Sequence, residues 1–259
     1  MELSLLYYLR RRKPIIGKKR IKPCNYPFTE IFDNTDRWEK SLWYSDVLIA
    51  DVPKCVKPYV GEKCALPRDI IKPRPYWQYG IVVKDLKCDR ARIELYFQGQ
   101  ELKWNSSIQD WECADSYSRY VYVHVIIRET DKYMCYLELE PKFQYLECTG
   151  VYVIDRNYND VTCGGPTFTL SVEPGPPFGW WHVIFEYRLL DDYTFKYWMF
   201  VDHPYLSTPK EYSDKFQYPT DDDRMAKMGI AISHGYYSEE YSKQELAIDN
   251  FTADEPQNV

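Results

Sequence analysis

Several short catalytic and metal-binding signatures are absent from this chain of 259 residues. Its eight cysteines include no Cys-x-x-Cys pair, which argues against a zinc ribbon and a thioredoxin-like redox site. The sequence also lacks a Gly-rich phosphate loop and a Gly-x-Ser-x-Gly nucleophile motif. No apolar run approaches the roughly 18 residues that span a bilayer as a helix. These absences predict a protein without a common nucleotide-binding, zinc-binding or transmembrane element.

Histidine is scarce, and the four histidines show no spacing typical of metal ligands. We therefore expect a structural or hydrogen-bonded role for each of them: His124, His182, His203 and His234. The run Asp221-Asp222-Asp223 could bind Ca²⁺, but that ion needs about six or more oxygen ligands that converge on it. A consecutive acidic run on a loop is more often solvated. We predict no metal or other cofactor, with Ca²⁺ at this run as the alternative.

The charge of the chain is distributed unevenly. Residues 1–22 carry eight Lys/Arg against the single Glu2, a net +7, which leaves −13 for the rest of a chain whose total is −6. A basic arm on an acidic body can bind nucleic acid, an anionic membrane or an acidic partner, or it can pack along its own body. We predict a basic N-terminal arm over residues 1–24, with nucleic acid as one potential partner. Its basic residues include Arg10, Arg11, Arg12, Lys13, Lys18, Lys19 and Arg20.

The extreme N-terminus places its apolar residues before its positive charges. Residues 1–9 are mostly apolar and are followed by Arg10 to Lys13. A secretory signal has the opposite order, with the positive charge first and a longer apolar run after it. We therefore expect no signal peptide, and a location outside the cell or on a virion surface would be reached by another route.

The even number of cysteines predicts disulfides, which fit an extracellular or virion setting. We predict a bridge between Cys55 and Cys64, because these two residues bracket a loop that contains proline and glycine. Asn105-Ser106-Ser107 and Asn250-Phe251-Thr252 match the N-glycosylation sequon, although such matches often arise by chance.

Period-two alternation of apolar and polar residues is the strongest structural signal. The chain contains 25 Tyr, 11 Phe and 8 Trp, residue types that favour strands. Core and outward positions alternate along four segments, which are 120–127, 134–140, 181–188 and 195–202. No segment keeps a helical 3.6-residue period over three turns. The pattern predicts antiparallel strands separated by turns.

The distribution of proline sets the expected domain boundaries. Five prolines fall within residues 53–77, a density that argues against a central strand or a helix there. A β-sandwich of this length often stays a single domain. We therefore predict one β-sandwich domain over residues 25–259, with a Pro/Cys-rich surface excursion at 53–77.

Several stretches, in this order, resemble the concanavalin A-like lectin/glucanase superfamily (laminin-G/laminarinase type). Phe28-Thr29-Glu30-Ile31-Phe32-Asp33 and Asp36-Arg37-Trp38-Glu39 resemble its opening strand. Residues 181–187 and 197–202 resemble its Trp-His strand and the hairpin partner that ends in Val-Asp, and residues 228–232 and 245–251 resemble its last two strands. The resemblance implies a two-sheet antiparallel jelly-roll sandwich. Fold alone does not supply function.

Laminarinase-type members of this superfamily carry Glu-x-Asp-x-x-Glu on one strand, and two of its carboxylates catalyse hydrolysis. The nearest match in this chain is Glu138-Leu139-Glu140-Pro141-Lys142-Phe143. Phe143 replaces the last carboxylate, Glu140 replaces the middle Asp, and Pro141 interrupts the strand. Glu138 and Glu140 are therefore only weak catalytic candidates, and we predict that the chain is not an enzyme.

The positions that alternate with the core would line one concave surface if their strands are neighbours. Tyr and Trp rings stack on sugars, and Glu and His bind hydroxyl groups, so this mixture suits a glycan. Packing under loops and contact with a protein are the alternatives. The predicted glycan-binding residues are Tyr122, His124, Tyr136, Glu138, Glu140, His182 and Trp198.

Three classes of function remain open. The favoured one is a non-enzymatic recognition or structural protein that contacts a glycan or a protein and is a component of a virion or an extracellular assembly. An active or degenerate glycoside hydrolase is the second class. A nucleic-acid-associated protein that uses the basic arm is the third. The chain could also form a homo-oligomer or serve as a subunit of a larger assembly.

Overall fold

A computed structural model describes most of the chain. The described residues are 24, 26–32, 36–67, 78–114, 121–142, 145–172, 179–190, 194–218, 226–234 and 243–259. The predicted basic arm from Arg10 to Arg20 and the candidate Ca²⁺ run Asp221–Asp223 lie outside the described residues.

The described residues form two antiparallel sheets and no helix. The nine-stranded sheet has the order β15-β14-β13-β6-β17-β4-β3, with β1 beside β17 and β7 beside β6. Its strands are β1 (Phe28–Glu30), β3 (Leu48–Asp51), β4 (Cys64–Pro67), β6 (Arg90–Asn105), β7 (Asp110–Cys113), β13 (Trp181–Leu189), β14 (Thr194–Asp202), β15 (Lys210–Gln217) and β17 (Lys243–Asp254).

The eight-stranded sheet has the order β11-β10-β9-β8-β16-β5-β2, with β12 beside β10. Its strands are β2 (Trp38–Lys40), β5 (Gln78–Cys88), β8 (Val121–Glu129), β9 (Tyr133–Lys142), β10 (Tyr145–Asp155), β11 (Asp160–Gly164), β12 (Phe168–Ser171) and β16 (Ala226–His234).

One large apolar core lies between the two sheets. On β8 the core residues are Val121, Val123, Val125 and Ile127, and on β13, β14 and β9 every second residue is likewise buried in the same core. Side chains alternate between the two faces of a strand, so the intervening residues lie on the outer faces of the sandwich. The predicted two-sheet antiparallel sandwich is confirmed.

The predicted surface excursion at 53–77 is wrong for one stretch. Residues 64–67 form β4, which lies between β17 and β3 and is buried at every position. Proline appears there only at the last residue, Pro67, so Cys64, Ala65 and Leu66 keep backbone N–H groups that can enter a sheet. Residues 52–63 cross the surface as an irregular loop, and residues 68–77 lie outside the described part.

The predicted Cys55–Cys64 disulfide is also wrong. Cys55 is bonded to Cys113 of β7, Cys24 is bonded to Cys88 of β5, and Cys64 is a free, buried thiol. Cys64 belongs to β4 and lies beside Asp249 of β17, under the loop that carries Cys55. Sequence proximity favoured the local pair, whereas the sheet brings the distant β7 to Cys55.

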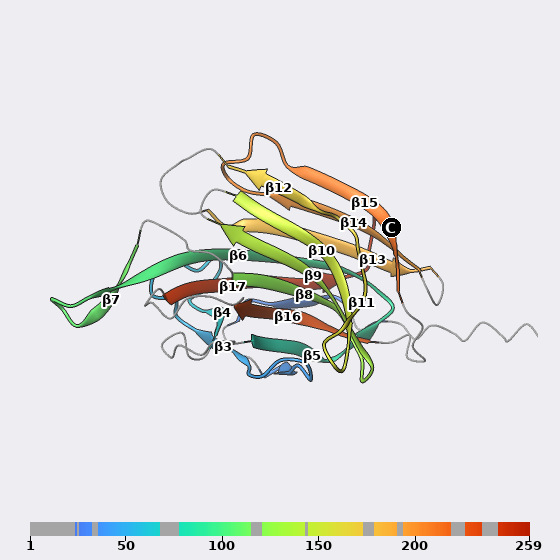
Figure 1. Ribbon diagram of the computed structural model, residues 1–259, viewed down its shortest axis with the longest axis horizontal. Helices are drawn as coiled ribbons and strands as arrows, with labels where there is room; N and C mark the ends of the chain where they lie inside the picture. Colours follow the sequence, from blue (N-terminus) through green and yellow to red (C-terminus); the bar gives the residue numbers. More distant parts are fainter. Residues whose placement is uncertain are drawn as a thin grey trace, which may run out of the picture.

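The β6–β7 hairpin extends beyond the rest of its sheet. β6 pairs with β13 and β17 along most of its length, but its last residues pair with β7 on the β13 side. Figure 1 shows this hairpin reaching away from the sandwich at the left of the view. The Cys55–Cys113 disulfide ties the base of the hairpin to the loop 52–63.

Candidate functional site

The predicted glycan-binding residues lie on both outer faces of the sandwich. β8 and β9 belong to the eight-stranded sheet, whereas β13 and β14 belong to the nine-stranded sheet. The prediction of one shared surface is therefore wrong. Strands of both sheets alternate core and outward residues in the same way, so the alternation does not show which strands are neighbours. The eight-stranded sheet carries Tyr122, His124, Tyr136, Glu138 and Glu140, and the nine-stranded sheet carries His182 and Trp198.

On the eight-stranded sheet, His124 is the centre of a polar network. His124 Nε2 lies 3.2 Å from Glu138 Oε2 and 3.1 Å from Ser233 Oγ, and its Nδ1 lies 2.6 Å from the Tyr44 hydroxyl. A carboxylate only accepts hydrogen bonds, so in the neutral ring Nε2 carries the proton and Nδ1 accepts from Tyr44. Thr149 donates a hydrogen bond to the other carboxylate oxygen of Glu138 at 2.7 Å.

This network is closed to solvent at its centre. The Tyr44 ring lies against Gly80 of β5, where a Cβ atom would be 2.4 Å from the ring, so glycine is required there. Tyr136 stacks on His124 with 4.3 Å between ring centroids. His124 is only 5% exposed. Burial raises the pKa of Glu138, but its hydrogen bonds with His124 and Thr149 outweigh burial and hold that pKa below its ordinary value.

Glu140 belongs to a separate ion pair. Lys142 Nζ lies 3.1 Å from Glu140 and 2.8 Å from Glu147, and Glu140 is buried. A glycosidase needs one ionised and one protonated carboxyl group on either side of the bond to be cleaved. Glu138 and Glu140 instead lie on the same strand, β9. Glu138 is held by His124 and Thr149, and Glu140 is held by Lys142. This geometry does not favour hydrolysis.

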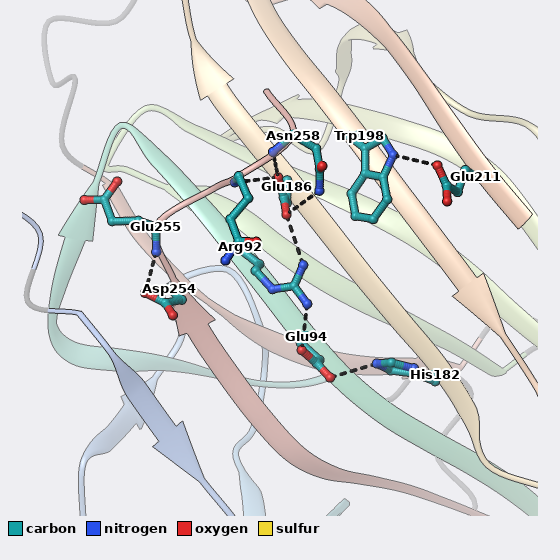
Figure 2. Close-up of polar contacts among 10 residues, drawn as sticks. Arg92, Glu94, His182, Glu186, Trp198, Glu211, Asp254, Glu255 and Asn258 are labelled. Carbon is teal, nitrogen blue, oxygen red and sulfur yellow. Dashed lines mark hydrogen bonds and ion pairs between the residues drawn. The ribbon is translucent and has the colours of Figure 1, made fainter. Parts of the chain in front are cut away.

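The outer face of the nine-stranded sheet is more open. Across β6, β13 and β14 the register aligns Arg92 with Glu186 and Trp198, and it aligns Tyr96 with His182. Figure 2 shows the polar chain that results, in which Arg92 lies between Glu186 and Glu94, and Glu94 contacts His182. Side chains from three strands therefore meet on one face.

Of the two carboxylates that contact Arg92, Glu94 is the one that reaches the surface. It accepts hydrogen bonds from His182 Nε2 at 2.8 Å and from Arg92 at 3.1 Å. The hydrogen bond from His182 lowers the pKa of Glu94 below its ordinary value, and the charge of Arg92 adds to this effect, while burial opposes it. The Glu94 side chain is still 22% exposed. An ionised acceptor is thus held at the surface in a fixed position.

Two aromatic rings lie on β14, which the strand β13 separates from Glu94 on the same face. The rings of Trp198 and Phe200 are nearly parallel, at an interplanar angle of 22° with 6.3 Å between centroids, and both side chains are half-buried. Trp198 Nε1 donates to the exposed Glu211 of β15 at 3.3 Å, as Figure 2 shows. The Phe200 ring packs edge-on against His182. The result is an aromatic platform, Trp198 and Phe200, with carboxylates at both sides.

Loop 52–63 adds a further aromatic residue, Tyr59, to the face. Tyr59 stacks on Tyr96 with 3.9 Å between ring centroids, and Tyr96 stacks on His182 at 4.3 Å. Tyr59 is 45% exposed. Trp180 Nε1 donates to the carbonyl oxygen of Lys57 in the same loop. The ring contacts therefore run from β14 across β13 and β6 to the loop.

Two buried carboxylates of β17 hold this loop in place. Glu245 accepts hydrogen bonds from three consecutive backbone N–H groups, those of Lys54, Cys55 and Val56. Asp249 accepts from the N–H groups of Tyr59 and Val60. Burial raises the pKa of Asp249 in spite of these bonds. Because an unpaired buried carboxylate is costly, the loop and the sheet depend on each other.

The C-terminal segment donates hydrogen bonds to Glu186, the most deeply buried carboxylate of this face. Glu186 is fully buried, and it pairs with Arg92 at 3.0 Å. The backbone N–H groups of Gln257 and Asn258 donate to Glu186 at 2.9 and 2.6 Å, and the Asn258 side-chain amide adds a further bond. Figure 2 shows the bonds between Asn258 and Glu186. Residues 257–258 therefore hold Glu186 in place beside Arg92.

Sequence reasoning missed several members of this surface. Arg92, Glu94 and Tyr96 alternate with core residues of β6 in the same period-two pattern that singled out His182, so the signal for them was present. Phe200 alternates with the core in the same way. Tyr59 had no comparable signal, because it belongs to an irregular, proline-rich loop.

The described residues contain no cluster of three or more His, Cys, Asp or Glu side chains that could hold a metal ion. In the same part of the chain there is no helix long and apolar enough to cross a membrane.

Comparison with known proteins gives matches only among solved structures. No family model and no curated protein matches the sequence. The carbohydrate recognition domain of Emp47p is 9% identical, with a TM-score of 0.46 over 90% of this chain and 96% of that one. Arcelin-5, a lectin-like defense protein from Phaseolus vulgaris, is 10% identical, with a TM-score of 0.44 over 89% of this chain and 99% of that one.

A GH131 beta-glucanase catalytic domain from Podospora anserina is 9% identical, with a TM-score of 0.43 over 83% of this chain and 86% of that one. These are the kinds of protein that the sequence resemblance named. At such values the similarities carry no argument about a site, so the proposal below rests on the side chains of this chain.

Proposed function

We propose that this chain is a non-enzymatic glycan-binding protein and that it binds through the outer face of its nine-stranded sheet. The observation that carries the proposal is the half-buried platform of Trp198 and Phe200 on the same sheet face as the ionised, partly exposed Glu94, which lies across β13 from it. The corresponding network around His124 is buried at its centre and satisfied internally, so it is the less suitable surface.

The chemistry of the face matches that of a sugar. The apolar C–H faces of pyranose rings pack against aromatic rings, and their hydroxyl groups donate to carboxylates. Trp198 and Phe200 supply the apolar surface, and Glu94 and Glu211 supply acceptors on either side of it. Two nearly parallel rings along one strand suit consecutive rings of an oligosaccharide better than a single sugar.

The proposed setting is extracellular. The two disulfides, Cys24–Cys88 and Cys55–Cys113, are of a kind that persists in oxidising environments. Within that setting the chain would attach to a glycan-bearing surface or assembly. The nucleic-acid alternative depends on the arm at residues 10–20 and remains a separate hypothesis.

Binding to an oligosaccharide array, followed by calorimetric titration of the best ligand, tests the proposal. Trp198→Ala should weaken binding by about 1–2 kcal/mol, a factor of roughly 5–30, because stacking and burial are lost. Trp104→Ala is the matched control, since Trp104 is an exposed tryptophan on the distant hairpin. Equal affinities for wild type and Trp198→Ala, or no ligand on the array, would contradict the proposal.

A further inference from the structure

The two N-glycosylation sequons of the chain lie in very different structural surroundings. Asn105-Ser106-Ser107 begins at the last residue of β6, whereas Asn250-Phe251-Thr252 lies inside β17. An N-glycan needs an asparagine that a large enzyme can reach on an exposed segment. The structure therefore separates two sites that the sequence pattern treats as equal.

Asn105 is at the tip of the projecting β6–β7 hairpin. Residues 106–109 form the turn, and Ser106, Ser107 and Ile108 are all exposed. Figure 1 shows that this hairpin extends beyond the other strands of its sheet. Asn105 pairs with Asp110 in the last register position before the turn. An enzyme can thus approach Asn105 without displacing any other part of the described fold.

The side-chain amide of Asn105 makes two local contacts. Its Oδ1 accepts a hydrogen bond from the Ser107 N–H at 2.9 Å, which folds the sequon into a compact turn. Its Nδ2 donates to Glu112 Oε1 at 2.7 Å. Glu112 is an exposed residue of β7, so its side chain can turn into solvent and release the amide nitrogen. Neither contact encloses Asn105 within the protein.

Asn250 lies at a β-bulge inside β17, between residues that are paired with both neighbouring strands. Its neighbours Asp249 and Phe251 are fully buried, and its own N–H donates to Asp249 Oδ1. Thr252 pairs with Thr29 of β1 on one side and with Glu94 of β6 on the other. The sequon can therefore enter an enzyme cleft only if β17 leaves the sheet, which would remove part of the core.

We propose that Asn105 is an N-glycan attachment site and that Asn250 is not. In the reaction, Asn105 Nδ2 forms a bond to the anomeric carbon of an oligosaccharide carried on a lipid diphosphate. The bond from that carbon to the phosphate oxygen breaks, the lipid diphosphate leaves with the electron pair, and the amide gives up one proton to a base. The Cys55–Cys113 disulfide at the base of the same hairpin fits the oxidising compartment in which such donors are used.

The attached sugar would cover an apolar part of the surface. Trp104 is 49% exposed and Ile108 is 58% exposed, and Trp104 packs against Trp111 across the hairpin. Apolar side chains grouped at a projecting tip favour association unless something covers them. A hydrophilic glycan on Asn105 shields this tip. This role is independent of glycan binding on the outer face.

The test is secretion of the full chain, behind a secretory leader, from a eukaryotic cell line that performs N-glycosylation. Intact mass is measured before and after treatment with an amidase that removes N-glycans. We expect one glycan, with the asparagine at position 105 converted to aspartate by the amidase and identified by peptide mapping. Unmodified Asn105 in the secreted protein, or a glycan on Asn250 alone, would overturn the proposal.

Three variants make the result specific. Asn105→Gln and Ser107→Ala should each abolish the mass shift, because each removes one essential part of the sequon. Asn250→Gln should leave the mass shift unchanged. A shift that persists in Asn105→Gln, or disappears in Asn250→Gln, would refute the assignment. Circular dichroism of each secreted variant confirms that the β-sandwich is retained.

Discussion

Glu94 and His182 lie 88 positions apart in the sequence, yet His182 Nε2 is 2.8 Å from Glu94 Oε1 on the outer face of the nine-stranded sheet. β6 and β13 bring them together, and Arg92 holds the second oxygen of Glu94. This contact joins the aromatic stack of Tyr59 and Tyr96 to the platform on β14. The candidate surface therefore depends on strand order as much as on residue type.

Stability should depend on pH through Glu94. The pKa of Glu94 is lower in the folded chain than its ordinary value of 4.5, so the folded state binds fewer protons there than the unfolded state. The resulting stabilisation is present above about pH 4.5 and is lost as the pH falls through the folded pKa. Urea midpoints of wild type and Glu94→Gln should therefore converge as the pH is lowered from 6 toward 3.

A double-mutant cycle with His182→Ala gives the control for this effect. Without His182 the largest cause of the lowered pKa is gone, so Glu94→Gln should change the pH dependence less in that background. An identical effect of Glu94→Gln in both backgrounds would show that His182 does not act on Glu94.

The Cys55–Cys113 disulfide should stabilise the loop that carries Tyr59. The two cysteines are separated by 58 positions, for which the chain-entropy relation gives about 4 kcal/mol. The double variant Cys55→Ser, Cys113→Ser should lose about 2–4 kcal/mol of unfolding free energy in urea titrations. It should also weaken glycan binding, since the Tyr59 loop then loses its covalent link to β7.

Peptide mapping without reductant tests the same bridge directly. A Cys55–Cys113 peptide should appear in wild type and also in Cys64→Ala, because Cys64 takes no part in the bond. A peptide that links Cys55 to Cys64 would contradict the assignment.

Removing the carboxylate of Glu186 should destabilise the protein strongly. Glu186→Ala removes one of the two carboxylates that Arg92 contacts, and it leaves two backbone N–H groups of the C-terminal segment without their acceptor. Leaving donors without an acceptor costs about 1–3 kcal/mol for each buried group. Glu211→Ala is the control, because Glu211 is an exposed carboxylate on the same face and should change stability by about 0.5 kcal/mol at most. Similar urea midpoints for the two variants would refute the structural role of Glu186.

The chain should not hydrolyse β-glucans. Glu138 is held by His124 and Thr149, and Glu140 is held by Lys142, so neither is free to protonate a leaving group. Reducing-end assays on a β-glucan panel should give the same rate as buffer. A measurable rate that Glu138→Gln abolishes would instead establish the glycoside hydrolase alternative.

The sequence predicted the parts of the fold that depend on local periodicity. In residues 121–127 and 195–201, every second residue is apolar and alternates with an outward residue. A strand can bury that apolar side when it packs in a sandwich. The pattern identified which side of each strand faces the core, and so it identified His182 and Trp198 as outward residues. It could not state which strands are neighbours, because period-two alternation is the same in both sheets.

The sequence by itself determined the class of fold and the faces of its strands, because side-chain alternation is a property of each strand alone. Tertiary structure decided which outward residues meet, and it placed His124 and His182 on opposite faces of the sandwich. It also decided that Cys55 bonds to Cys113, because β7 approaches the loop 52–63 only after β6 has crossed the sheet. Contacts of this kind depend on strand order, and strand order is a property of the whole chain.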